Sequence, residues 1–139
     1  MNSSNPSFRP TINNCVKPYL LQLADVIESF GAPDRQLDAR IAVAVFPALG
    51  DLPRIDEAVW LHRDGSRVRA LRYTFAIAAA TTLIPSGNWL EQDIEVRGRY
   101  WIYGPGADDK VSAINSFPPL AVCAAALRAV QRKRSLAYG

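Results

Sequence analysis

One stretch organises this chain: Gly31-Ala32-Pro33-Asp34-Arg35-Gln36-Leu37-Asp38-Ala39-Arg40-Ile41-Ala42. Gly31 can supply the left-handed backbone position that commonly follows a helix. Pro33 prevents that helix from continuing, because the residue before a proline avoids the α region. Asp34 is a favourable N-cap residue, and Leu37 begins the apolar face of a new helix. The stretch therefore predicts the end of one helix, a turn and the start of a second helix.

Working outward, apolar residues at three- and four-residue steps predict helices over residues 18–30, 34–46, 73–84 and 120–134. Each helix is expected to bury one face, made by Leu20, Leu23, Ala24, Ile27 and Phe30 in the first, Leu37, Ile41, Ala44 and Val45 in the second, Ile77, Ala80, Thr81 and Leu83 or Ile84 in the third, and Leu120, Cys123, Ala124, Leu127 and Val130 in the last. We expect Thr74 to cap the third helix. The basic residues Arg132, Lys133 and Arg134 suit the negative end of the last helix's dipole.

Between the helices, the sequence predicts short antiparallel strands. Asp64-Gly65 separates two β-prone segments within residues 59–68 and is typical of a hairpin turn, whereas residues 47–58 are expected to form a loop. Strict alternation over residues 89–96 predicts a half-buried strand, which a two-residue turn at Arg97-Gly98 joins to a partner over residues 99–103. That turn would place Ile94 opposite Trp101. Residues 110–115 can make one more strand.

The length of 139 residues fits one domain. We expect residues 1–14, rich in Asn, Ser and Pro, to be a flexible arm and residues 15–139 to form the domain. The predicted fold class is α+β: a two-layer α/β sandwich in which a small, mostly antiparallel sheet packs against about four helices. No apolar run approaches the ~20 residues of a membrane span, so the sequence predicts a cytoplasmic protein without a membrane partner.

The net charge and the cysteine content exclude few classes of function by themselves. The net charge of +3 is too small to indicate nucleic-acid binding alone. Two basic clusters, within residues 63–72 and 128–134, are interpreted as solvated faces. Cys15 and Cys123 are far apart, and two reduced thiols are favoured over a disulfide, which would need their Cα atoms within about 7 Å.

Three blocks of sequence resemble the phage "ABA sandwich" domain family, a group of small phage and prophage proteins. The blocks are residues 31–42, residues 73–85 and residues 119–129. Two departures stand out, because Ala32 interrupts the family's Gly-Pro-Asp-Arg pattern and Ala78 stands where the family often has an aspartate. The resemblance implies helix–sheet–helix layering and a phage origin. It implies no particular reaction.

Catalysis is not expected, and neither is a metal or a cofactor. His62 is the only histidine, and the cysteines have no metal-ligand spacing. Glu91, Asp93 and Glu95 share one strand face and could hold a divalent cation, although alternating acids are more typical of a solvent-facing sheet. Asp34 and Asp38 lie one helical turn apart and could be catalytic, but a cap and an acid paired with Arg35 explain them better.

Binding is favoured over catalysis, although tryptophans that anchor the core, with arginines as their solvated rim, are the more ordinary explanation of the same residues. Arginines give bidentate contacts to phosphate and aromatic rings stack on bases, so a small phosphorylated nucleotide is the predicted ligand. The candidate ligand-binding residues are Arg35, Arg69, Tyr73, Trp89, Arg97, Arg99, Trp101 and Tyr103. A phage accessory protein could use such a site to sequester a signal of host defence. The alternatives are a nucleic-acid-binding protein that uses the two basic clusters, and a structural or interaction module. A homo-oligomer is also expected. If the protein is an interaction module, subunits could associate by exchanging the arm of residues 1–14.

Overall fold

The computed structural model describes residues 17–138 and has the predicted α+β class. The predicted arm of residues 1–14 and Cys15 lie outside the described residues. Two three-stranded antiparallel sheets, β1-β2-β3 and β4-β5-β6, accompany the helices. In chain order the elements are α1 (Tyr19–Ser29), α2 (Arg35–Val45), the 3₁₀ helix η3 (Pro47–Asp51), β1 (Arg54–Asp56), β2 (Val59–Leu61), β3 (Arg67–Arg69), α3 (Ile77–Thr81), β4 (Trp89–Gln92), β5 (Arg99–Tyr103), β6 (Lys110–Ile114) and α4 (Pro118–Tyr138).

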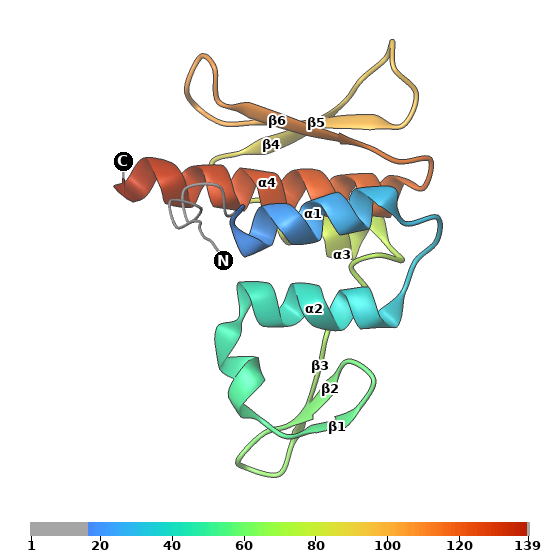
Figure 1. Cartoon of the computed structure of the whole chain (residues 1–139), viewed down its shortest axis with the longest axis vertical. Helices are drawn as coiled ribbons and strands as arrows, with labels where there is room; N and C mark the ends of the chain where they lie inside the picture. Colours follow the sequence, from blue (N-terminus) through green and yellow to red (C-terminus); the bar gives the residue numbers. More distant parts are fainter. Residues whose placement is uncertain (1–16, 139) are drawn as a thin grey trace, which may run out of the picture.

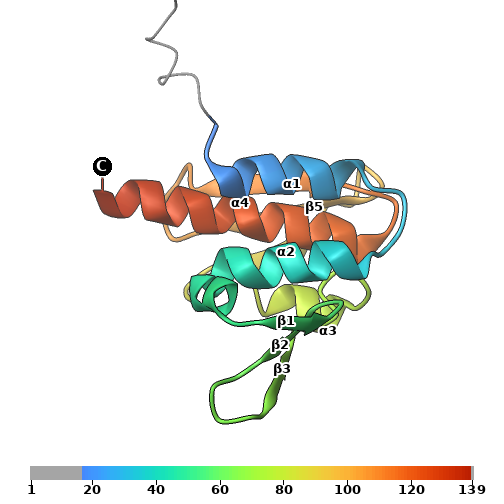
Figure 2. The same ribbon diagram turned by 60° about the horizontal axis from the view of Figure 1, so that its bottom comes forward.

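Helices form the middle of the molecule, and the two sheets lie at its opposite ends (Figure 1). The β4–β6 sheet packs on α4, which lies beside α1. α2 lies on the side of this helix pair away from the β4–β6 sheet (Figure 1), and next to α4 in the second view (Figure 2). The helix–sheet–helix order that the family resemblance implies is therefore not observed. The β4–β6 sheet packs on the helices with one face, as antiparallel sheets commonly do.

α4 is the centre of the core. Residues 120–127 are buried all round the helix rather than along one stripe, because the β4–β6 sheet, α1 and α3 surround them. The run consists of leucine, valine, cysteine and small alanines, which is the composition expected of a helix enclosed on every side. Its basic residues do not end the helix, since α4 continues to Tyr138. The dipole explanation for Arg132, Lys133 and Arg134 is therefore wrong.

The opening stretch forms the two predicted helices, with one difference. Asp34 caps α2 as expected, its carboxylate accepting a hydrogen bond from the backbone N–H of Leu37 at 3.0 Å. Gly31 does not adopt the left-handed conformation, because α1 ends instead through an extended Phe30. The side-chain amide of Asn115 donates to the carbonyls of Glu28 and Phe30, and so satisfies this helix end from another element.

The third helix is much shorter than predicted. α3 covers Ile77–Thr81, and residues 73–76 precede it as a turn followed by extended backbone. Thr74 does not cap this helix, since its N–H and hydroxyl bind Asp38 of α2. Of its expected buried face, Ala80 and Leu83 are buried, whereas Ile77 is exposed.

The β1–β3 sheet contains the predicted hairpin and one strand that the sequence analysis did not predict. β2 and β3 pair antiparallel around Asp64-Gly65, as expected, and Gly65 has the positive φ of +91° that such a turn requires. β1 lies within residues 47–58, which were interpreted as a loop. Its backbone pairs with β2, although all three of its side chains are exposed and leave no alternating pattern.

The β4–β5 pairing differs from the predicted register. β4 ends at Gln92, and Glu91 rather than Ile94 lies opposite Trp101. The reversal takes residues 93–98 instead of two, because the Asp93 carboxylate accepts backbone hydrogen bonds from Glu95 and Val96 and so starts the turn early. Ile94, expected in the strand, is 97% exposed in that turn. β5 matches its predicted range, and β6 ends at Ile114, one residue earlier than predicted.

Candidate functional site

The eight predicted binding residues fall into two separate groups. Arg35, Arg69 and Tyr73 belong to α2, β3 and the segment after β3, whereas Trp89, Arg97, Arg99, Trp101 and Tyr103 belong to the β4–β5 hairpin. These strands belong to the sheets at opposite ends of the molecule (Figure 1). The predicted residues therefore do not make one site, and each group has a different geometry.

The first group lies at a cleft of about 1030 Å³. Such a volume is at the upper end of the range for small-molecule sites. α2, η3, β3, the end of α3 and α4 all contribute to it. Its apolar lining comprises Ala42, Val45, Phe46, Ala48, Leu49, Leu52, Val68, Ala70, Leu71, Leu83 and Val130. Phe46 and Leu71 are 59% and 48% exposed, so the apolar surface continues into the solvent at this cleft.

Charged side chains on the cleft are mostly basic. Arg63, Arg69 and Arg134 line it together with His62, and Asp51 is the one acid among the described lining residues. All three arginines are exposed. Arginine is suited to bidentate binding of phosphate or carboxylate. The cleft thus combines an apolar interior with a positive rim.

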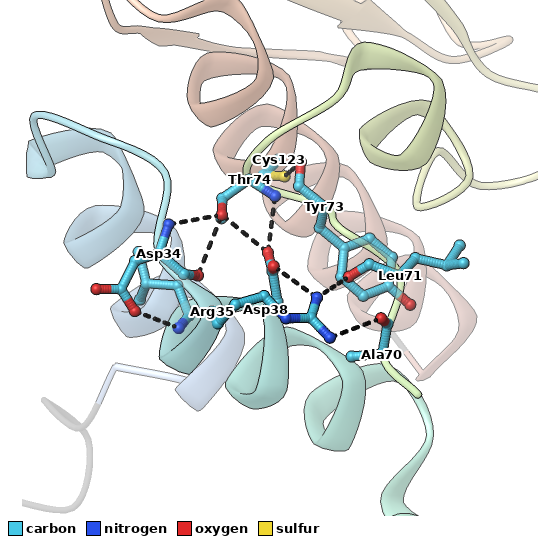
Figure 3. A network of polar contacts seen from close by, with 9 residues as sticks. Asp34, Arg35, Asp38, Ala70, Leu71, Tyr73, Thr74 and Cys123 are labelled. Atoms are coloured by element: carbon cyan, nitrogen blue, oxygen red, sulfur yellow. Dashed lines mark hydrogen bonds and ion pairs between the residues drawn. The ribbon is translucent and has the colours of Figure 1, made fainter. Parts of the chain in front are cut away.

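A buried polar network stands behind the cleft wall (Figure 3). The Asp38 carboxylate is fully buried and accepts hydrogen bonds from Arg35 Nη1 at 2.9 Å and from the backbone N–H and hydroxyl of Thr74, each at 2.8 Å. Thr74 Oγ1 also accepts from the backbone N–H of Asp34 at 2.9 Å. A buried carboxylate is tolerated only when donors satisfy it, as they do here.

Arg35 connects this network to the cleft. Its guanidinium donates to the carbonyls of Ala70 and Leu71, both of which line the cleft, while also pairing with Asp38. The predicted intrahelical pair is therefore confirmed, and its side chains are 16% and 0% exposed. With these donors in use, Arg35 positions the cleft wall and is not among the cleft's lining residues.

Tyr73 lines the cleft beside a buried thiol. Burial raises the pKa of Tyr73, and the nearby Cys123 and Asp38 add to the effect. Cys123 Sγ donates to the carbonyl of Tyr73, and burial, with the charge of Asp38, raises the pKa of that thiol too. The interpretation of Cys123 as a core thiol is confirmed, because the side chain is fully buried and free.

The second group forms an aromatic face on the β4–β6 sheet. Trp89, Trp101 and Tyr103 project from the side opposite the buried Ile102, and Trp89 stacks on Tyr103 with ring centroids 5.9 Å apart. Arg99 lies over Trp101, 5.5 Å from the ring centroid. Arg97 is exposed in the turn between β4 and β5.

The second basic cluster is only in part the solvated face that the sequence predicts, because Lys133 and Arg134 are exposed whereas Arg128 is not. Arg128 is only 19% exposed and donates to Asp25, Glu28 and the carbonyl of Ser112. Arg132 and Lys133, also in this cluster, contact Asp109 and the carbonyl of Ser86. Because these cations hold elements of the fold together, little of the cluster is left for a nucleic-acid backbone. Arg134, at the cleft, is an exception.

The acids on β4 and its turn have structural partners. Asp93 accepts from the Trp101 indole N–H and from two backbone N–H groups, which together hold its pKa below the usual value. Glu91 accepts from the indole N–H of Trp89. Across residues 17–138, no three His, Cys, Asp or Glu side chains gather closely enough to hold a metal ion. Within the same range, no helix has the length and apolarity to cross a membrane.

Sequence analysis missed most of the cleft. Phe46, Leu49 and Leu52 were assigned to the end of a helix and to a loop, yet they recur every three residues. That spacing places side chains on one side of a 3₁₀ helix, which is the structure that η3 adopts. The signal was present but short, and a three-residue period over seven residues is easily taken for a loop.

No protein-family model matches the chain, and no curated protein matches it. Among solved structures, the chain is similar to a phage protein from Bacillus cereus ATCC 14579. The two are 12% identical over 74% of this chain and 93% of that chain, with a TM-score of 0.46. The resemblance to the ABA sandwich family thus rests on the three sequence blocks and stays a prediction.

Proposed function

We propose that this protein binds a small anionic ligand in the cleft without transforming it. The observation that carries the proposal is the cleft itself, about 1030 Å³ with apolar walls and three arginines around it. An apolar or aromatic ligand body would remove Phe46 and Leu71 from water. This burial would stabilise the complex by about 25 cal/mol for each Å² of apolar surface buried. An anionic group would stay near the rim and bind Arg63, Arg69 or Arg134.

The phosphorylated nucleotide predicted from the sequence belongs to this ligand class. Its phosphate suits the arginines, and its base could lie against the apolar wall near Tyr73. The resemblance to phage proteins supplies a biological role for such binding: sequestration of a nucleotide signal of host defence. A long-chain carboxylate shares the same chemistry of an apolar body and an anionic head, so the test includes both.

Calorimetry and thermal shift on the full chain would test the proposal. The panel contains cyclic nucleotides, ADP-ribose-type nucleotides and a long-chain fatty acid, with an uncharged nucleoside as the control for the anionic group. We expect at least one anion to bind and the nucleoside to bind at least tenfold more weakly, because it lacks the group that meets the arginines. No binding across the panel would refute the proposal.

Two arginine variants locate the site, with a third as a matched control. Arg69→Ala and Arg134→Ala are expected to weaken anion binding by about tenfold each, the loss of one charge-assisted contact worth roughly 1.4 kcal/mol. Arg67→Ala is the control, because Arg67 is exposed on the same strand as Arg69 yet does not line the cleft. Equal affinities for all three variants would place the ligand elsewhere.

A further inference from the structure

The outer face of the β4–β6 sheet carries an aromatic surface that the proposed function does not use. Side chains alternate along β5, so Tyr100 and Ile102 face the core while Trp101 and Tyr103 face outward. Trp89, opposite Tyr103, completes the outer set and is 48% exposed. Within the described chain, no helix or strand covers this side of the sheet (Figure 1).

The aromatic rings are held in fixed orientations. Trp89 and Tyr103 stack with 20° between their planes, and Trp101 follows with its centroid 6.2 Å from that of Tyr103. Each indole N–H donates to a carboxylate, Trp89 to Glu91 and Trp101 to Asp93, at 2.9 Å in both cases. Rings fixed in this way lose little conformational entropy when a flat ligand stacks on them.

Two cations border the same surface. Arg99 and Lys110 lie over Trp101, 5.5 and 5.2 Å from its ring centroid. The nearest acid to Arg99 is Asp93, whose Oδ2 is 3.7 Å from Arg99 Nη1, beyond hydrogen-bond distance. The Nε of Arg99 is buried and has no hydrogen-bond partner within residues 17–138, whereas the side chain as a whole is 31% exposed. The exposed part of the Arg99 side chain, and not its buried Nε, is therefore what an anionic group could meet at this surface.

We propose that this face binds single-stranded nucleic acid, with bases stacked on Trp89 and Tyr103 and phosphates bound by Arg99 and Lys110. Stacked aromatic rings beside cations on an open sheet are a recurrent platform for unpaired bases. A duplex cannot use the platform, because its bases are stacked inside the helix. A second copy of this chain would have to bury Glu91, Arg99 and Lys110, whereas a single strand leaves its phosphates and these charges in contact with water.

Fluorescence anisotropy with labelled ten-nucleotide oligothymidine and oligouridine, added to the full chain, would test this proposal. We expect both single strands to bind and a duplex of the same length to bind at least tenfold more weakly. For two phosphate contacts, the logarithm of affinity should fall against the logarithm of salt concentration with a slope of about −1.4. Absence of binding to both single strands at 50 mM salt, or a slope near zero, would overturn the proposal.

Variants separate this surface from the cleft. Trp89→Ala should weaken single-strand binding by about 5- to 150-fold, the loss of one stacked base. Lys110→Ala should lower affinity for both oligonucleotides alike and reduce the salt slope by about 0.7. Phe46→Ala, a large aromatic truncation at the cleft, is the matched control and should leave oligonucleotide binding unchanged. Weakening by Phe46→Ala to the same extent as by Trp89→Ala would contradict the proposed site.

Self-association through the aromatic face is the competing outcome, and light scattering detects it. If wild type forms a dimer that Trp89→Ala converts to a monomer, the face is occupied by a second copy and the proposal is wrong. Failure here leaves the cleft proposal unaffected, because Arg69→Ala and Arg134→Ala report on the cleft alone. Success of both would make this a protein with two independent binding surfaces.

Discussion

At the scale of single residues, Asp38 explains why the stretch from Gly31 to Ala42 is so distinctive. Its carboxylate has no solvent contact and is held by Arg35 from its own helix and Thr74 from 36 residues away. The helix spacing predicts the pair with Arg35. Thr74 could not be predicted as its partner, because a threonine after Tyr73 is equally typical of a helix cap.

Asp38→Asn should destabilise the fold by about 3 kcal/mol, because it removes one partner of a buried pair and leaves Arg35 facing an amide. Urea unfolding followed by circular dichroism measures the change. Asp108→Asn is the control: its side chain is exposed, and the hydrogen bonds that its backbone carbonyl accepts, from Arg132 and from the N–H of Lys110, do not depend on the side chain. We expect the control to stay within about 0.5 kcal/mol of wild type. Equal urea midpoints for the two variants would show that the buried network adds no stability.

At the scale of elements, the turn between β4 and β5 shows what alternation cannot decide. The alternating pattern continues through Ile94 to Val96, so a strand to Val96 was the natural prediction. Asp93 ends the strand because its carboxylate binds the backbone N–H groups that a longer strand would use elsewhere. A side chain that binds backbone N–H groups competes with the hydrogen bonds between the strands. This competition is local, but the alternating pattern gives no sign of it.

Two glycines allow this hairpin's turn to be tested. Gly98 has φ of +80°, and a Cβ there would lie 2.8 Å from the carbonyl oxygen of Asn115. Gly87 has a similar φ of +84° with nothing within 4 Å. Gly98→Ala should therefore cost about 2–3 kcal/mol of unfolding free energy, and Gly87→Ala about 1 kcal/mol from backbone strain alone. Thermal or urea unfolding measures both, and equal losses would refute the close approach of Asn115, which follows β6, to this turn.

At the scale of the whole molecule, element types were more predictable than their assembly. Periodicity predicted α1 and α2 from their one-sided burial and also predicted α4, although α4 is buried all round, whereas β5 was predicted as the partner strand across the turn at Arg97-Gly98. Neither the separation of the sheets to opposite ends nor the split of the eight binding residues between them follows from spacing. Those arrangements depend on long-range contacts such as Arg128 with Asp25 and Glu28, about a hundred positions apart in the chain.

Arg128 also contributes to the pH dependence of stability. Hydrogen bonds from Lys17 and Arg128 lower the pKa of Asp25. Burial alone would raise the pKa of Glu28, but hydrogen bonds from Arg128 and the N–H of Ile114 outweigh it and lower the pKa. Carboxylates whose pKa is lower in the folded state stabilise the fold above the unfolded values of 3.8 and 4.5, and lose that contribution as pH falls through the folded values.

Urea midpoints should therefore stay level from pH 7 to 5 and fall from pH 4 to 3. Arg128→Met should lower the midpoint at pH 7, because Glu28 and the carbonyl of Ser112 lose a partly buried donor. It should also flatten the fall below pH 4, since Asp25 and Glu28 then titrate nearer to their unfolded values. Arg67→Met, at an exposed position, is the control and should keep the full fall. If both variants retain the same acid dependence, the Arg128 contacts are not its source. Two other carboxylates must then account for it: Asp93, and Asp64, because hydrogen bonds from Ser66 lower the pKa of Asp64 to about 2.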